Sequence, residues 1–152
     1  MEVFDMFTFF FSALTVFISD QHIKRKIRQD THLPRPLGRQ IILRYSRNSG
    51  MFMNLLEDHP RFVSVLTSLL LVILSVFAFF TCRKESAILI RLSFGLICGG
   101  AASNVYDHLT CGFVTDYISF RRPARFSHIV YNLADFAIFL SAAMMTAASV
   151  RT

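Results

Sequence analysis

The chain is poor in several residue types that mark common protein classes. Its 152 residues include no tryptophan, three cysteines and four prolines. The cysteines, Cys82, Cys98 and Cys111, are odd in number and widely scattered, which argues against a disulfide framework and against a metal site. Free cysteines usually pack as small hydrophobic residues, and we expect that role for all three. The sequence also contains no internal repeat and no low-complexity segment.

Acidic residues are scarce as well. The chain has ten acidic residues against 16 lysines and arginines, so its formal net charge is +6. A basic soluble protein would suit nucleic acid, but 53% of the residues are hydrophobic and the mean hydropathy is +0.47. This composition is typical of a membrane protein. We therefore expect anionic phospholipid headgroups, and no nucleic acid, as the partner of the positive charge.

Four long apolar segments dominate the chain. They cover about residues 2–20, 62–81, 87–106 and 131–150, and Phe62 to Thr81 contains no charge at all. The first segment begins with Glu2 and Asp5 and lacks the basic start and small-residue cleavage site of a signal peptide, so we expect it to stay as a helix ending at Asp20. The expected fold is a single membrane domain over residues 1–152, with an all-α core of four transmembrane helices.

The two polar stretches between these segments, residues 21–61 and 107–130, are expected to lie outside the membrane. Prolines 34 and 36 predict an irregular connection, and residues 40–45 have the β-branched and aromatic content of a strand. Residues 47–50 are typical of a turn, and 51–56 of a second strand. Residues 113–120 also have strand character. These stretches predict a small extramembrane β-sheet with loops.

Three carboxylates, Asp107, Asp116 and Asp135, lie at the edges of apolar segments, where a charge is energetically costly and needs a reason. Asn104 precedes Asp107 by three residues, and Asn132 precedes Asp135 by three, so each pair shares a helix face. A loop between Asp116 and Asp135 would bring their carboxylates together. At close range one keeps its proton while the other stays charged, which suits acid–base catalysis of aspartic proteolysis.

This part of the chain resembles the lipoprotein signal peptidase (signal peptidase II) family. The family pattern runs G-G-A-x-G-N-x-x-D-R-x-x-x-G-x-V-x-D-(F/Y)-I, followed later by (F/Y)-N-x-A-D-x-x-I. The matching residues are Gly99, Gly100, Ala101, Asn104, Asp107, Gly112, Val114, Asp116, Tyr117, Ile118, Tyr131, Asn132, Ala134, Asp135 and Ile138. Ser103 stands where the pattern has Gly, and His108 where it has Arg. The residues after Gly50 are Met51-Phe52-Met53 in place of Ala-Ala-Phe.

The resemblance implies that Asp116 and Asp135 form a catalytic dyad below the small sheet, with no metal and no cofactor. It also implies an Asp-x-x-x-Lys pair in the first helix, which Asp20 and Lys24 match. The supporting or substrate-binding residues are then Asp20, Lys24, Asn48, Asn104, Asp107, His108 and Asn132. The implied activity is an aspartic endopeptidase that removes signal peptides from prolipoproteins, cutting before the lipid-modified cysteine.

The resemblance further implies a monomer in the bacterial inner (cytoplasmic) membrane, a multi-pass protein with its active site towards the outer face. The charge distribution points the other way. Twelve of the 16 basic residues lie on the side of the aspartates and four on the opposite side, so the positive-inside rule would place the aspartates in the cytoplasm. We follow the dyad motif because it is more specific than a charge count.

Two other functions fit parts of the pattern. The departures at Ser103, His108 and residues 51–53 suit a non-catalytic lipid- or lipoprotein-binding paralogue, although a scaffold alone gains nothing from two carboxylates near hydrocarbon. A small proton-coupled transporter would use buried aspartates, but both dyad residues lie near one membrane face and not at the midplane.

Overall fold

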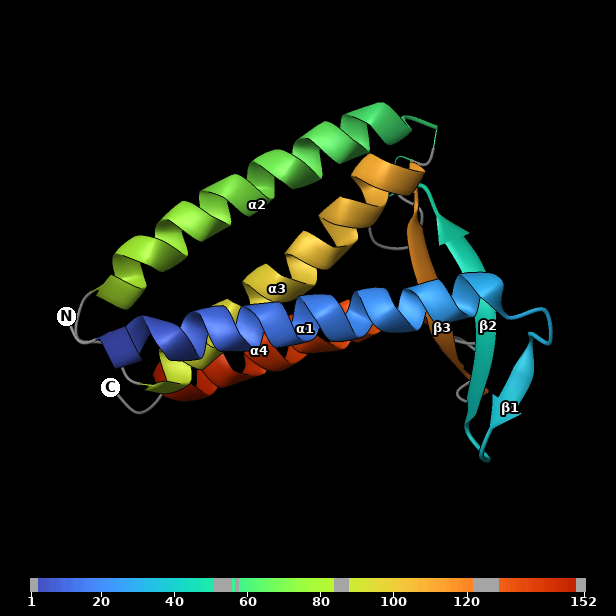
Figure 1. Cartoon of the computed structure of the whole chain (residues 1–152), viewed down its shortest axis with the longest axis horizontal. Coiled ribbons are helices and arrows are strands. Elements are labelled where there is room, and N and C mark those ends of the chain that lie inside the picture. The colour runs from blue at the N-terminus through green and yellow to red at the C-terminus, as the bar shows by residue number, and fades with distance from the viewer. Residues whose placement is uncertain (1–2, 51–55, 57, 84–87, 122–128, 150–152) are drawn as a thin grey trace.

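A computed structural model describes residues 3–50, 56, 58–83, 88–121 and 129–149 of the chain. Helices form most of it, and a small antiparallel sheet closes one end (Figure 1). The elements are α1 (Val3–Gln29), β1 (Arg35–Leu37), β2 (Ile41–Asn48), α2 (Pro60–Arg83), α3 (Ile88–Cys111), β3 (Val114–Phe120), β4 (Val130–Tyr131) and α4 (Leu133–Ser149). The expected combination of a helical core and a small sheet is therefore correct.

Helix α3 lies at the centre and packs against both α1 and α4, whereas α2 leans away along much of its length (Figure 1). Glycines make the central packing close. A Cβ at Gly99 would overlap the backbone of Ala13 on α1, and one at Gly100 would lie 2.7 Å from the carbonyl oxygen of Ala134 on α4. Small residues at these crossings let the helix backbones approach directly.

Two helices run further than their apolar segments. Helix α1 continues beyond Asp20, its expected end, to Gln29, because its polar side chains there are buried against α3. Helix α3 likewise continues beyond residue 106 to Cys111, so Asp107 and His108 belong to a helix and not to a loop. Gly112, with φ of +78°, ends it by donating its N–H to the His108 carbonyl at 3.1 Å.

The sheet has the order β1-β2-β3-β4 with antiparallel pairs throughout. The strands expected near residues 40–45 and 113–120 are confirmed as β2 and β3. Two local predictions are wrong: Pro36 lies within edge strand β1, where a missing N–H is tolerated, and Arg47 and Asn48 extend β2 by pairing with β3. The strand expected at 51–56 falls almost wholly outside the described residues.

Among the helices of the described residues, two, α2 over Pro60–Cys82 and α3, are long and apolar enough to cross a membrane, and α4 is a shorter apolar helix. The predicted count of four transmembrane helices is therefore not confirmed. Most of the large side chains of α2 are exposed, including Val65 at 68% and Phe77 at 61%. Cys82 and Cys98 lie in an apolar cluster with Ala78 and Phe94, which confirms their packing role. The packing role expected for Cys111 is wrong, because this last residue of α3 is exposed.

Candidate active site

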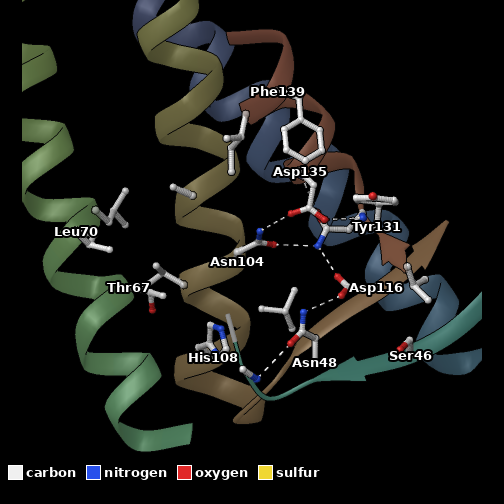
Figure 2. Close-up of a pocket in the computed structure, with 18 of the residues that line it drawn as sticks. Ser46, Asn48, Thr67, Leu70, Asn104, His108, Asp116, Tyr131, Asp135 and Phe139 are labelled. Atoms are coloured by element: carbon white, nitrogen blue, oxygen red, sulfur yellow. Dashed lines mark hydrogen bonds between the residues drawn. The ribbon is translucent and has the colours of Figure 1, made fainter. Parts of the chain in front are cut away.

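A cavity of about 570 Å³ opens where α2, α3 and α4 meet the sheet (Figure 2). Its walls differ in chemistry. Carboxylates and amides line the end next to the sheet, whereas Leu70, Leu74 and Phe139 line the part between α2 and α4. Six of the nine residues singled out in the sequence line it: Asn48, Asn104, His108, Asp116, Asn132 and Asp135.

Asp135 is fixed by the start of α4. Asn132 precedes the helix, and its side-chain Oδ1 accepts the Asp135 N–H at 2.9 Å. In return, Asp135 Oδ2 accepts the Asn132 backbone N–H at 3.0 Å. This reciprocal pair is a capping box, which satisfies donors that the first turn of a helix leaves free. The i, i+3 spacing noted in the sequence thus acts as a helix cap that also orients a carboxylate.

Asp116 enters the cavity from β3 and meets amide donors on two sides. Its Oδ1 accepts from Asn132 Nδ2 at 2.7 Å, and its Oδ2 accepts from Asn48 Nδ2 at 3.2 Å (Figure 2). The pairing of β2 with β3 places Asn48 opposite Val114, two residues from Asp116. Asn132 therefore contacts both aspartates, capping one and donating to the other.

Asn104 on α3 completes the link between the two carboxylates. Its Nδ2 donates to Asp135 Oδ1 at 3.1 Å, and its Oδ1 accepts from Asn132 Nδ2 at 3.2 Å. The same Oδ1 accepts from Lys24 Nζ at 2.9 Å, so the oxygen faces two donors and the NH₂ group faces Asp135. The positive charge of Lys24 beside the oxygen and the carboxylate of Asp135 beside the NH₂ group therefore fix the orientation of the Asn104 side-chain amide.

Burial raises the pKa of Asp116 to about 7. The neighbouring negative charge of Asp135 contributes to this rise, and hydrogen bonds from Asn132 and Asn48 and the charge of Lys24 oppose it. Two carboxylates near each other in such surroundings share a proton near neutral pH. The adjacent Tyr117 also has its pKa raised well above the usual range, because it is buried and faces Asp20.

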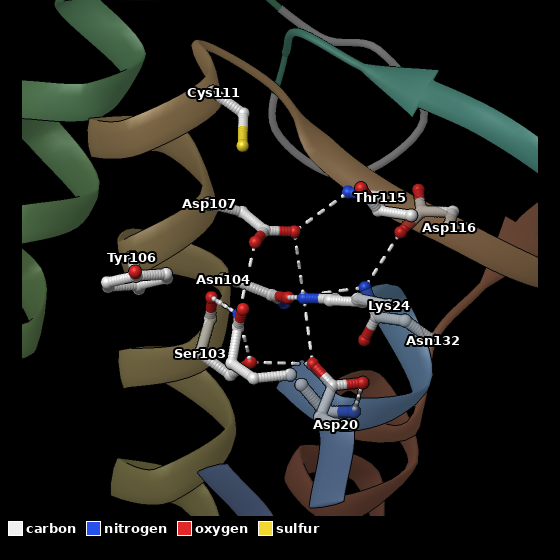
Figure 3. A network of polar contacts seen from close by, with 12 residues as sticks. Asp20, Lys24, Ser103, Asn104, Tyr106, Asp107, Cys111, Thr115, Asp116 and Asn132 are labelled. Atoms are coloured by element: carbon white, nitrogen blue, oxygen red, sulfur yellow. Dashed lines mark hydrogen bonds and ion pairs between the residues drawn. The ribbon is translucent and has the colours of Figure 1, made fainter. Parts of the chain in front are cut away.

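Asp20, Lys24 and Asp107 do not line the cavity. They form a buried cluster behind it, with all three side chains fully inaccessible (Figure 3). Lys24 Nζ lies 2.7 Å from Asp20 Oδ2 and 3.3 Å from Asp107 Oδ2. Since Lys24 also donates to Asn104, this cluster reaches the dyad through one amide.

Tyr117 links the same cluster to α4. Its hydroxyl donates to Asp20 Oδ1 at 3.1 Å and accepts the Leu133 N–H at 2.9 Å. Asp107 is held in turn by the Thr115 N–H at 3.0 Å and, more loosely, by Arg28 at 3.5 Å. The strand that carries Asp116 and the helix that carries Asp135 are therefore both attached to the buried ion pairs.

Gln21, whose amide donates to Asp107 at 3.1 Å, was not identified from the sequence, and neither were Arg28 and Thr115. Tyr117 was named only as a match to the family pattern, without a role. One signal was available, because positions 20, 21, 24 and 28 are polar and follow a helical spacing. His108 lines the cavity with its Nδ1 buried and without a hydrogen-bond partner among the described residues. That described part of the chain contains no group of three or more His, Cys, Asp or Glu side chains placed to hold a metal ion.

The arrangement supports proton transfer. Two carboxylates share a cavity large enough for a peptide segment, amide donors fix their orientation, and burial keeps a proton on the pair near neutral pH. Such a pair can accept a proton from a water molecule and give one to a leaving group.

Comparison with known proteins finds lipoprotein signal peptidases among the relatives of this chain. A lipoprotein signal peptidase of Caldicellulosiruptor bescii is 34% identical over 67% of this chain and 62% of its own length, so the match spans less than two thirds of that relative. A lipoprotein signal peptidase of Halothermothrix orenii is 28% identical over 88% of both chains. A solved structure of a bacterial membrane enzyme superposes with a TM-score of 0.81, at 19% identity, over 95% of this chain and 88% of its own. The profile of the family described as signal peptidase (SPase) II matches residues 12–151, and the chain belongs to that family.

Proposed function

We propose that the protein is an aspartic endopeptidase that removes signal peptides from lipid-modified prolipoproteins, cutting before the diacylglyceryl cysteine. Membership of the signal peptidase II family supports the reaction. The observation that carries the aspartic mechanism is the convergence of Asp116 and Asp135 on one cavity, with Asn132 contacting both. No cofactor is required by this mechanism.

In this mechanism the dyad holds one proton and one water molecule. The ionised carboxylate takes a proton from water as the water oxygen attacks the scissile carbonyl carbon. The protonated carboxylic acid then gives its proton to the amine nitrogen as the peptide bond breaks. The immediate products are a carboxylic acid on the signal peptide, which then releases its proton to water, and a free amine on the lipidated cysteine, and the dyad returns to a singly protonated state.

The membrane setting follows from the same proposal. All four helices cross the bilayer of the bacterial inner membrane, with the sheet and the dyad at its outer face. The apolar arm of the cavity, between α2 and α4, suits a substrate that arrives within the membrane. The enzyme works as a monomer, because one chain supplies both aspartates, and its basic sheet end contacts anionic phospholipid.

Cleavage of a synthetic or purified lipidated prolipoprotein by the purified chain tests the proposal. We expect wild type to release the signal peptide, and Asp116→Asn and Asp135→Asn each to lower turnover by about a thousandfold or more, because an amide cannot exchange the proton. Asparagine at 135 can still accept the Asn132 N–H, so the variant should remain folded.

The matched control is Asp30→Asn, whose carboxylate pairs with Arg35 at the sheet end, away from the cavity. Near-normal turnover by either dyad variant would remove that residue from the mechanism. Binding of the lipidated substrate without any turnover by wild type would instead indicate a protein that only carries lipoproteins.

A further inference from the structure

We infer that Ser103 and Gln21 are positioning residues for the dyad, acting through Lys24 and resting on the function proposed above. Neither contacts the cavity. Both are buried, with Ser103 fully inaccessible. Gln21 on α1 donates to Ser103 on α3, whose position is shown in Figure 3. Ser103 occupies the position at which the family pattern has glycine, so its hydroxyl is a particular feature of this chain.

The hydrogen-bond directions around Ser103 follow from its neighbours. Gln21 Nε2 lies 2.9 Å from Ser103 Oγ, 3.1 Å from the Ser103 carbonyl oxygen and 3.1 Å from Asp107 Oδ1. An amide nitrogen can only donate, so the Ser103 hydroxyl accepts from Gln21 and keeps its own proton free. That proton goes to Asp20 Oδ2 at 2.6 Å, a charge-assisted hydrogen bond.

The two residues thus hold both carboxylates that flank Lys24. Ser103 anchors Asp20, Gln21 anchors Asp107, and the ammonium lies between the two carboxylates. Lys24 has three N–H donors, and its three partners, Asp20, Asp107 and Asn104, use all of them. A shift of the ammonium towards either carboxylate therefore weakens its bond to Asn104.

The side-chain amide of Asn104 connects Lys24 to Asp135, so the position of the ammonium affects how the dyad is oriented. Its oxygen stays on Lys24, which leaves its NH₂ group on Asp135 Oδ1. Without the Ser103 hydroxyl, Asp20 Oδ2 keeps Lys24 as its remaining donor among the described residues and draws the ammonium closer. Asn104 then loses its charged partner, and the positive charge moves away from the dyad.

The charge of Lys24 lowers the pKa of Asp116, so a more distant ammonium lets that pKa rise. Turnover requires one ionised carboxylate, so the acidic limb of the pH profile of kcat should move to higher pH. The other charged or titratable groups that face Lys24 or the dyad are Asp20 and Arg28 on α1, Asp107 and His108 on α3, Tyr117 on β3, and Tyr131 on β4.

The test measures kcat and KM for cleavage of a lipidated prolipoprotein between pH 5 and 8. The variants are Ser103→Ala, Gln21→Leu and the double variant. We expect each single change to lower kcat by about tenfold to a hundredfold, as for loss of a hydrogen bond to a charged group, and to leave KM unchanged. In both single variants the acidic limb of the pH profile should move to higher pH. The double variant should lower kcat by less than the product of the two single factors.

Ser93→Ala is the matched control, because Ser93 is a fully buried serine of the same helix whose hydroxyl bonds, among the described residues, only to the carbonyl of Leu89 on its own helix. Its kcat and pH profile should equal those of wild type. If Ser103→Ala does not yield folded protein, Gln21→Leu carries the test, since it removes the donor and keeps a side chain of similar size.

Wild-type kinetics in both single variants, or kcat lowered by one constant factor at every pH, would overturn the inference, because a constant factor indicates only a smaller folded fraction. These outcomes leave the proposed function intact as long as wild type cleaves the substrate. A wild-type chain that does not cleave contradicts the proposed function, and this inference falls with it.

Discussion

Asp116 is a buried carboxylate that the fold holds at an energetic cost. Its pKa of about 7 lies above the value of 3.8 for an exposed aspartate, so the folded protein binds this proton more tightly than the unfolded chain. The protonated form is stabilised by folding and the ionised form is not. This residue therefore favours the folded state least above pH 7, where it must be charged in both states.

The corresponding prediction concerns stability against pH. Relative to Asp116→Asn, wild type should lose about 2–3 kcal/mol of unfolding free energy between pH 5 and pH 8.5, an order of magnitude set by a pKa of about 7 in the folded protein against 3.8 in the unfolded chain. Thermal unfolding of both proteins in detergent at the two pH values measures the difference. Asparagine leaves one of the two amide donors without an acceptor, but that penalty does not depend on pH. Parallel melting temperatures would contradict the raised pKa.

At the same scale, the sequence shows which residues carry charge but not which ones they touch. Asp116, Asp135, Asn104 and Asn132 are recognisable from their spacing near apolar segments. The contact between Gln21 and Ser103 is not, because 82 residues separate them and only the packing of α1 on α3 brings them together.

The start of α4 combines two tasks that a substitution at Asn132 can separate. Asn132→Ser keeps an oxygen that can cap the helix but removes the NH₂ group that reaches Asp116 and Asn104. We expect near-normal thermal stability with kcat lowered by about tenfold to a hundredfold.

Asn132→Ala is the matched comparison, because it removes the cap as well. It should show the same loss of kcat and lose a further ~0.5–2 kcal/mol of stability. Full activity in the serine variant would show that the bridge between the aspartates contributes nothing to turnover, and equal stability of the two variants would show the same for the cap.

The crossing of α1 and α3 depends on a missing side chain. Gly99→Ala would place a Cβ in the backbone of Ala13, so the helices must move apart. We expect a loss of about 1–3 kcal/mol, the usual cost of overpacking, although alanine normally favours a helix over glycine. Chemical or thermal unfolding measures it, and a stabilised variant would indicate that the two helices are free to separate.

Element positions were predictable where the pattern is local. The apolar runs of α2 and α3 and the β-branched run of β2 are visible in the sequence. The ends of α1 and α3 were not, because the polar residues beyond Asp20 and Tyr106 look like the start of a loop. They remain helical because Lys24 and Asp107 pair with each other across the two helices, which a pattern along one segment does not contain.

The whole molecule offers a natural test of its orientation. Cys111 is exposed at the end of α3 that meets the sheet, whereas Cys82 and Cys98 are buried. A membrane-impermeant maleimide added to intact bacteria producing the chain should therefore label Cys111 if the dyad faces outwards. Cys111→Ser should remain unlabelled. Labelling that requires permeabilised cells would place the sheet end in the cytoplasm, as the positive-inside rule suggests.

The overall class was predictable because hydropathy and composition act over the whole chain. A helical membrane core with a small sheet follows from four apolar runs and two polar stretches. The cavity does not, because it depends on how far α2 leans from α4 and on which side chains of both helices face the gap. The division of the site into a lined cavity and a buried ion-pair cluster likewise exists only in three dimensions.

The capping box at Asn132 and Asp135 has an evolutionary consequence. In the mechanism proposed above, selection for a stable start of α4 and selection for turnover act on the same two side chains. A lineage that no longer needed the reaction would still lose stability by discarding this pair, so the motif can outlast the activity. Asp116, which caps nothing and is costly to bury, is the position at which a descendant that had abandoned catalysis would be expected to change first.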